Sequence, residues 1–78
     1  MMRRILDEQG GIWDAVVGRE SWGTLYALFV PAGPASTQPV RQALLQSAGY
    51  EQAQQELDAM DEAALRALFR AAQPREPR

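Results

Sequence analysis

The stretch that decides the fold is 23–31, GTLYALFVP. It is the most apolar segment of the chain, and no charged residue occurs from position 23 to position 40. Its length, its aromatic and aliphatic residues and the glycine and proline that bound it are typical of a β-strand. Because apolar side chains occur at successive positions, we predict a strand over 24–30 with both faces covered.

A helix is the alternative for this stretch. Four of its side chains have the spacing i, i+3, i+4, i+7, which places them on one helical face: Trp22, Leu25, Tyr26 and Phe29. Gly23 would then lie in the first turn, where glycine disfavours a helix. Glycines also recur at intervals that suit hairpins, so the strand is the favoured interpretation.

Two further strands are predicted before it, over 2–7 and 12–17. Asp7 and Gly10 suit the first and fourth positions of a type I turn between these strands. Alternation along 12–17 places Trp13 and its i+2 neighbours on one face, and Ile12, Asp14 and Val16 on the other. Three strands with short connections predict an antiparallel meander.

Helices are predicted for the rest of the chain, the first over 39–48. Pro39 suits the first turn of a helix, and Gly49 suits a left-handed C-cap, after which Tyr50 would pack back on the helix. A modest apolar stripe has helical spacing: Val40, Ala43, Leu44 and Ser47.

Two more helices are expected over 51–57 and 61–72, with the Asp61 carboxylate capping the second. One continuous helix over 51–72 is the alternative, because this range contains neither glycine nor proline.

The predicted class is therefore α+β, with the helices packed on one face of the sheet. We expect a single domain over 1–73 and a flexible tail over 74–78. The predicted core consists of large apolar residues at compatible strand and helix phases: Trp13, Leu25, Phe29, Leu44, Leu57, Leu65 and Leu68.

The composition limits the possible chemistry. The 78 residues include no cysteine, histidine or lysine, and the formal net charge is −2. Disulfides, thiolate metal sites and a histidine base are thereby excluded, and Ser21 has no basic side chain to activate it as a nucleophile. We therefore expect a protein that is not an enzyme and uses no cofactor.

Two groups of acidic residues stand out: a candidate cation site or general acid/base pair at Asp7, Glu8 and Asp14, and an acidic cluster at Asp58, Asp61 and Glu62. The first group matches no oxygen-rich loop of the kind that binds hard cations, and Asp7 is explained by the turn. Acidic residues in the second group suit a helix N-terminus. No metal site is predicted.

The sequence also bears on location. No apolar run approaches the roughly 20 residues needed to cross a bilayer, and the N-terminus has no apolar signal region. We expect a cytoplasmic protein and no membrane partner. Arginine in place of lysine, with abundant alanine, indicates a bacterial genome of high GC content.

Arginines and aromatic residues form the first candidate site: Arg3, Arg4 and Arg19 with Trp13, Trp22 and Tyr26. A sheet that carries both kinds of side chain can stack the bases of a single strand. The isoelectric point of about 4.9 that the sequence gives argues against a nucleic-acid binder. The alternative is that the aromatics fill the core and the arginines are solvated.

The favoured hypothesis is a small interaction module that binds a protein or a second copy of itself. In a simple meander the strand 24–30 would lie at an edge, without the charges that normally protect an edge. The linker 31–37, a second copy or a partner peptide could cover it. The predicted partner-binding residues lie on this strand and in the loop before it, where Trp22 could instead fold onto its own core: Arg19, Trp22, Tyr26 and Leu28.

Overall fold

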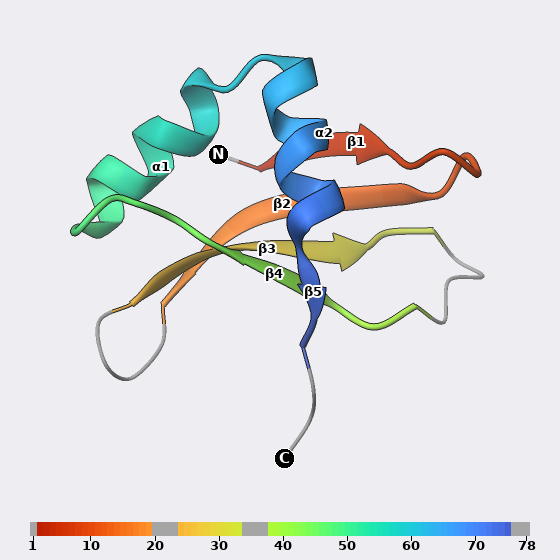
Figure 1. Ribbon diagram of the computed structural model, residues 1–78, viewed down its shortest axis with the longest axis horizontal. Helices are drawn as coiled ribbons and strands as arrows, with labels where there is room; N and C mark the ends of the chain where they lie inside the picture. The colour runs from red at the N-terminus through yellow and green to blue at the C-terminus, as the bar shows by residue number, and fades with distance from the viewer. Residues whose placement is uncertain (1, 20–23, 34–37, 76–78) are drawn as a thin grey trace.

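The computed structural model describes residues 2–19, 24–33 and 38–75, with only the backbone of Arg19, and shows an α+β fold (Figure 1). An antiparallel sheet is followed by two helices, and the chain then returns to the sheet. The elements in chain order are β1 (Arg3–Leu6), β2 (Ile12–Arg19), β3 (Leu25–Pro31), β4 (Arg41–Leu44), α1 (Tyr50–Ala59), α2 (Glu62–Ala71) and β5 (Gln73–Pro74).

The three predicted strands form where the sequence places them, and β3 confirms a strand rather than a helix over the described part of 21–30. The turn after β1 is closed by a hydrogen bond from Gly10 N to Asp7 O (3.1 Å). Gly10 has a φ of 82°, a left-handed conformation that glycine adopts without steric cost. The sequence therefore predicted this hairpin from its turn chemistry.

The strand β3 does not lie at an edge, so this prediction is wrong. The order across the sheet is β1-β2-β3-β4-β5, and β3 pairs with β2 on one side and with β4 on the other. The chain after β3 turns back and adds a further strand, which satisfies the backbone groups that an edge would expose. Neither the linker 31–37 nor a second chain is needed to cover them.

The strand β4 replaces the helix predicted over 39–48. Ala43 and Leu45 are buried whereas Leu44 is 60% exposed, so alternation decides the side-chain directions here and Leu44 does not belong to the core. The ladder offered by β3 outweighs the weak helical stripe, because local propensity yields to tertiary context. Gly49 has a φ of −121° and precedes α1, so it is not a left-handed C-cap.

The C-terminal helices are two, not one. Met60 has a ψ of 133°, an extended conformation that ends α1 and separates it from α2. Asp61 then caps α2, as predicted: its Oδ1 accepts a hydrogen bond from Ala64 N (2.8 Å). Tyr50 starts α1 and is 47% exposed, so it does not pack back on a preceding helix.

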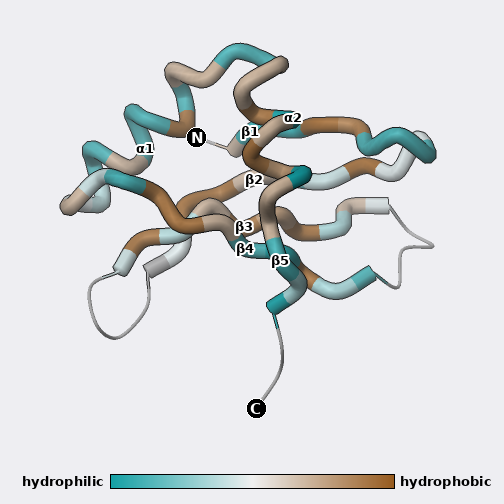
Figure 2. The backbone as a smooth tube through the Cα atoms, in the orientation of Figure 1, coloured by the Kyte–Doolittle hydropathy of each residue, from teal (hydrophilic) through white to brown (hydrophobic). Residues whose placement is uncertain are grey.

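The core lies between the helices and one face of the sheet, and Figure 2 shows hydrophobic colour concentrated on the strands and on part of α2. The shortest dimension is 20 Å, which fits two layers. The Phe69 ring lies 5.0 Å from the Trp13 ring and 5.2 Å from the Phe29 ring, centroid to centroid. Apart from Leu44, the predicted core residues are confirmed as buried or, for Leu68, partly buried against the cluster.

The chain returns to the sheet after α2. Gln73 and Pro74 form β5 beside β4, and Arg75 N donates a hydrogen bond to Val40 O (2.7 Å). Residues 74 and 75, which the sequence places in the tail, are therefore paired with the sheet.

Candidate functional site: the outer face of the sheet

The sheet has one face packed under the helices, here called the inner face, and one that the described helices leave uncovered, here called the outer face. The pairing register assigns side chains to each. Along β1–β4 the outer face consists of Arg4, Leu6, Ile12, Asp14, Val16, Gly18, Tyr26, Leu28, Val30, Gln42 and Leu44.

The outer face is apolar although it is exposed to solvent. Leu44 is 60% exposed, Leu6 48%, Val30 37% and Ile12 36%. Single exposed apolar residues are ordinary, but here they occupy one face of adjacent strands. Exposed apolar residues gathered on one face of a sheet mark an interaction site in many proteins.

The charges on the outer face neutralise each other. Arg4 and Asp14 are opposite each other on β1 and β2, and Arg4 Nε donates to Asp14 Oδ1 at 2.9 Å. This interaction raises the pKa of Arg4, first through the hydrogen bond and then through the charge of Asp14. The face therefore carries no net charge.

Near the end of β2, Gly18 leaves one position of the outer face without a side chain. Gly18 pairs with Tyr26, and Leu28 lies two residues further along β3. A Cβ atom added to Gly18 would lie 2.4 Å from Leu28 Cδ1, so the Leu28 side chain lies across the glycine. The strand register and this contact together fix the position of Leu28.

Two of the predicted partner-binding residues lie on the outer face. Tyr26 and Leu28 project from β3 and are half-buried. The other two cannot be placed: the Arg19 side chain and Trp22 lie outside the described residues.

Sequence reasoning missed most of this surface. Alternation along 12–17 places Ile12 and Val16 on one face of the strand and Trp13 on the other. The sequence does not show that the helices leave the face of Ile12 and Val16 uncovered. Leu44 was missed because its segment was predicted to be a helix.

The arginines and aromatic residues of the other candidate site are divided between the two faces. Trp13 is buried on the inner face, whereas Arg4 lies on the outer face. The Arg3 guanidinium donates to carbonyl oxygens at the end of α1, those of Leu57 (3.0 Å) and Met60 (2.8 Å) among them. Arg3 thus serves the helix C-terminus, where cations are favoured. The described members of the group do not form one stacking surface.

Asp7 performs the turn function predicted for it. Its carboxylate accepts hydrogen bonds from the backbone amides of Gln9 (2.8 Å) and Gly11 (2.7 Å) and from Trp13 Nε1 (3.0 Å). The Trp13 hydrogen bond is the main cause of a lowered Asp7 pKa, followed by that from Gly11. Among the described residues, no three acidic side chains gather as a metal site.

Comparisons with known proteins add no relative: no protein-family model, curated protein sequence or solved structure matches this chain. Neither described helix has the length and hydrophobicity required to cross a membrane. The function must therefore be argued from the geometry of the chain itself.

Proposed function

We propose that this chain is a small non-enzymatic interaction module that pairs with a second copy of itself through the outer face. The observation that carries the proposal is the uncovered apolar surface along β1–β4. The absence of histidine, cysteine and lysine from the sequence supports a function without catalysis. The proposed location is the cytoplasm.

A second copy suits the outer face because the face is neutral and self-complementary in chemistry. Two-fold pairing brings identical patches together, so a net charge would repel its own image. Here the only charged side chains, Arg4 and Asp14, already pair within one copy. Apolar sheet faces stack about 10 Å apart with interdigitated side chains, which would give each copy the layer it lacks.

The size of the outer face sets the expected strength of self-association. With about 4.8 Å between strands and about 6.8 Å between residues on one face, each position covers roughly 33 Å². The eleven positions defined above then give a flat footprint of about 360 Å² per copy. Two facing footprints total about 720 Å² before the relief of the side chains is added, which is below the standard range of about 1,200–2,000 Å². We expect a weak, concentration-dependent dimer.

Sedimentation velocity across a range of concentrations tests the proposal. Leu44→Lys and Val30→Lys place a charge on each of the two facing copies, and we expect each to weaken self-association at least tenfold. Tyr50→Lys is the matched control, because Tyr50 is similarly exposed but lies on α1. A wild type that remains monomeric at about 1 mM would overturn self-pairing, and a foreign protein would then be the remaining occupant.

Nucleic-acid binding is the less favoured function. The outer face offers one arginine, already paired with Asp14, and one aromatic side chain among the described residues, Tyr26. Stacking platforms combine several aromatics with unpaired positive charge. Fluorescence anisotropy with a labelled single-stranded oligonucleotide is expected to show no saturable binding at physiological salt. Saturable binding that Arg4→Gln abolishes would favour this function over self-pairing.

A further inference from the structure

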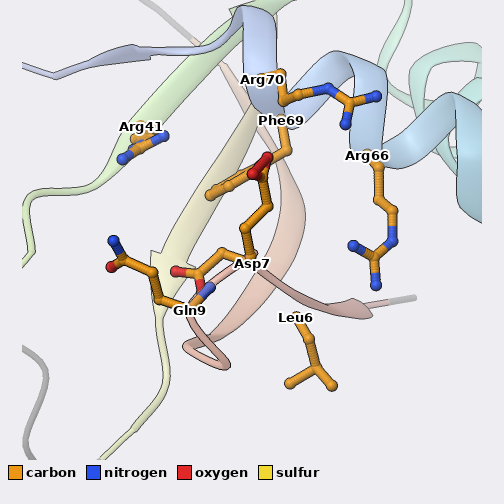
Figure 3. A pocket seen from close by; sticks show the side chains of 8 residues that line it. Leu6, Asp7, Gln9, Arg41, Arg66, Phe69 and Arg70 are labelled. Carbon is orange, nitrogen blue, oxygen red and sulfur yellow. The ribbon is translucent and has the colours of Figure 1, made fainter.

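A cavity of about 300 Å³ lies at the end of the sheet between the β1–β2 turn, β4 and α2, and Leu6 of the outer face is among its lining residues (Figure 3). Three arginines contribute to its lining: Arg41 from β4, and Arg66 and Arg70 from α2. Asp7 and Glu8 from the turn also line it. These five side chains give the cavity a formal charge of +1, whereas the whole chain carries −2.

Arg41 is held in place by aromatic rings. Its guanidinium carbon lies 5.1 Å from the centroid of a Trp13 ring and 4.8 Å from that of Phe69. Its Nε is buried and has no hydrogen-bond partner among the described residues. A guanidinium fixed by cation–π contacts but lacking a hydrogen-bonded carboxylate provides a pre-oriented positive charge.

Arg66 and Arg70 are one helical turn apart on α2, and Figure 3 shows them on the side of Phe69 opposite Arg41. The nearest carboxylate oxygen to Arg66 belongs to Glu62, 3.9 Å from Arg66 Nε, which is too far for a hydrogen bond. Arg70 forms no ion pair with a described residue. Both side chains therefore keep their donors for another acceptor.

The two acidic residues of the cavity differ in how many hydrogen bonds their carboxylates already accept. Asp7 accepts hydrogen bonds from Gln9 N, Gly11 N and Trp13 Nε1, so its oxygens are already occupied. Glu8 is exposed and forms no ion pair with a described residue. Both carboxylates oppose an incoming anion, but Glu8 is the one whose charge can be removed without breaking the hydrogen bonds of the turn.

We propose that this cavity binds a small molecule bearing two or more oxyanion groups, phosphate or carboxylate. Arg41 on one side of Phe69 and the arginine pair of α2 on the other would each hold one group, because guanidinium pairs well with such oxyanions. The groups that would hold the anion are separate from the pairing face, since none of the three arginines lies on the outer face, although Leu6 borders both.

Titration with pyrophosphate, and separately with citrate, tests the proposal by following backbone amide shifts in the 15N-labelled protein. We expect saturable shifts in the β1–β2 turn and in α2 with at least one of the two, and the stronger binder identifies the oxyanion. Arg70→Gln should weaken binding about tenfold, because a charge-assisted hydrogen bond is lost. Glu8→Gln should strengthen it several-fold by removing the opposing charge.

Arg4→Gln is the matched control, because it removes the same charge from the outer face. It should leave the affinity unchanged. The proposal is overturned if neither compound gives saturable shifts at 10 mM, or if Arg4→Gln weakens binding as much as Arg70→Gln. The second outcome would mean that the anion responds to arginine charge anywhere on the surface rather than to a site in the cavity.

Discussion

The two faces of the sheet are made by the same strands and are both apolar, yet only one is covered. On β3 the inner residues Leu25, Ala27 and Phe29 are 0–2% exposed, whereas the outer residue Val30 is 37% exposed. The helices α1 and α2 form a single layer, which is sufficient for one face only. An apolar strand therefore indicates burial on both sides only when the chain has enough residues to build a second cover.

The inner face also differs from the outer one in side-chain size. Ala15, Ala27 and Ala43 are buried in the inner layer, where small side chains leave room for the large residues of the helices. At the centre of the outer face, Val16 pairs with Leu28, and these larger side chains meet no helix. The sheet thus carries small side chains where the helices cover it and larger ones on the face that the described helices leave uncovered.

Two neighbouring residues of β3 give the largest predicted contrast. Phe29→Ala removes a fully buried ring from the inner face and should lower the free energy of unfolding by about 3–5 kcal/mol. Leu28→Ala, on the outer face, should cost less than about 1 kcal/mol in the monomer. Urea denaturation of dilute protein, where pairing does not contribute, measures both changes. Equal losses would mean that the outer face is covered within one chain.

The sequence predicted elements that depend on local signals. The hairpin at Asp7, the strand 24–30 and the cap at Asp61 all follow from turn, strand and capping residues close in sequence. It failed over 39–48, where alternating and helical spacings compete within a few residues. There the partner strand β3 decides, and pairing with a distant segment cannot be inferred from local spacing.

The candidate site was predictable only in part for the same reason. Tyr26 and Leu28 were predicted to bind a partner because their segment is the most apolar of the chain, and the structure places both on the outer face. Because β4 pairs with β3, the backbone of β3 is not available to another chain. What β3 leaves exposed is instead the outer face formed by its side chains. Leu6 and Ile12 join that face through the register of β1 with β2, which the sequence does not specify to the residue.

Two successive arginines of β1 provide a smaller contrast between the faces. Arg3 donates hydrogen bonds to the Leu57, Asp58 and Met60 carbonyl oxygens, so Arg3→Gln should lower the free energy of unfolding by about 1–2 kcal/mol. Arg4→Gln breaks an exposed ion pair and should cost no more than about 0.5 kcal/mol.

Thermal denaturation of the two arginine variants, side by side, measures this difference. Both substitutions remove one positive charge, so the effect of net charge cancels in the comparison. If Arg4→Gln lowers the melting temperature more than Arg3→Gln does, the end of α1 does not depend on Arg3. The Arg4–Asp14 pair would then stabilise the monomer.

The smallest expected effect on folding concerns Gly18, on the outer face near the end of β2. Alanine in a strand interior is favoured over glycine by roughly 0.5–1 kcal/mol. Its Cβ would lie 2.4 Å from Leu28 Cδ1 and 2.8 Å from Leu28 Cγ, so the Leu28 side chain must move. The two effects oppose each other, and we expect Gly18→Ala to leave the stability of the monomer within about 1 kcal/mol of the wild type.

Self-association should respond more strongly than folding, because displaced Leu28 alters the surface that pairs. We expect Gly18→Ala to weaken dimerisation several-fold in sedimentation velocity. The Leu28→Ala background supplies the control: with the Leu28 side chain truncated, Gly18→Ala meets no obstruction and should have little further effect, a coupling that a double-mutant cycle measures. If Gly18→Ala weakens dimerisation equally in both backgrounds, the loss comes from the β2 backbone rather than from Leu28. The central position of Leu28 in the proposed interface would then have to be abandoned.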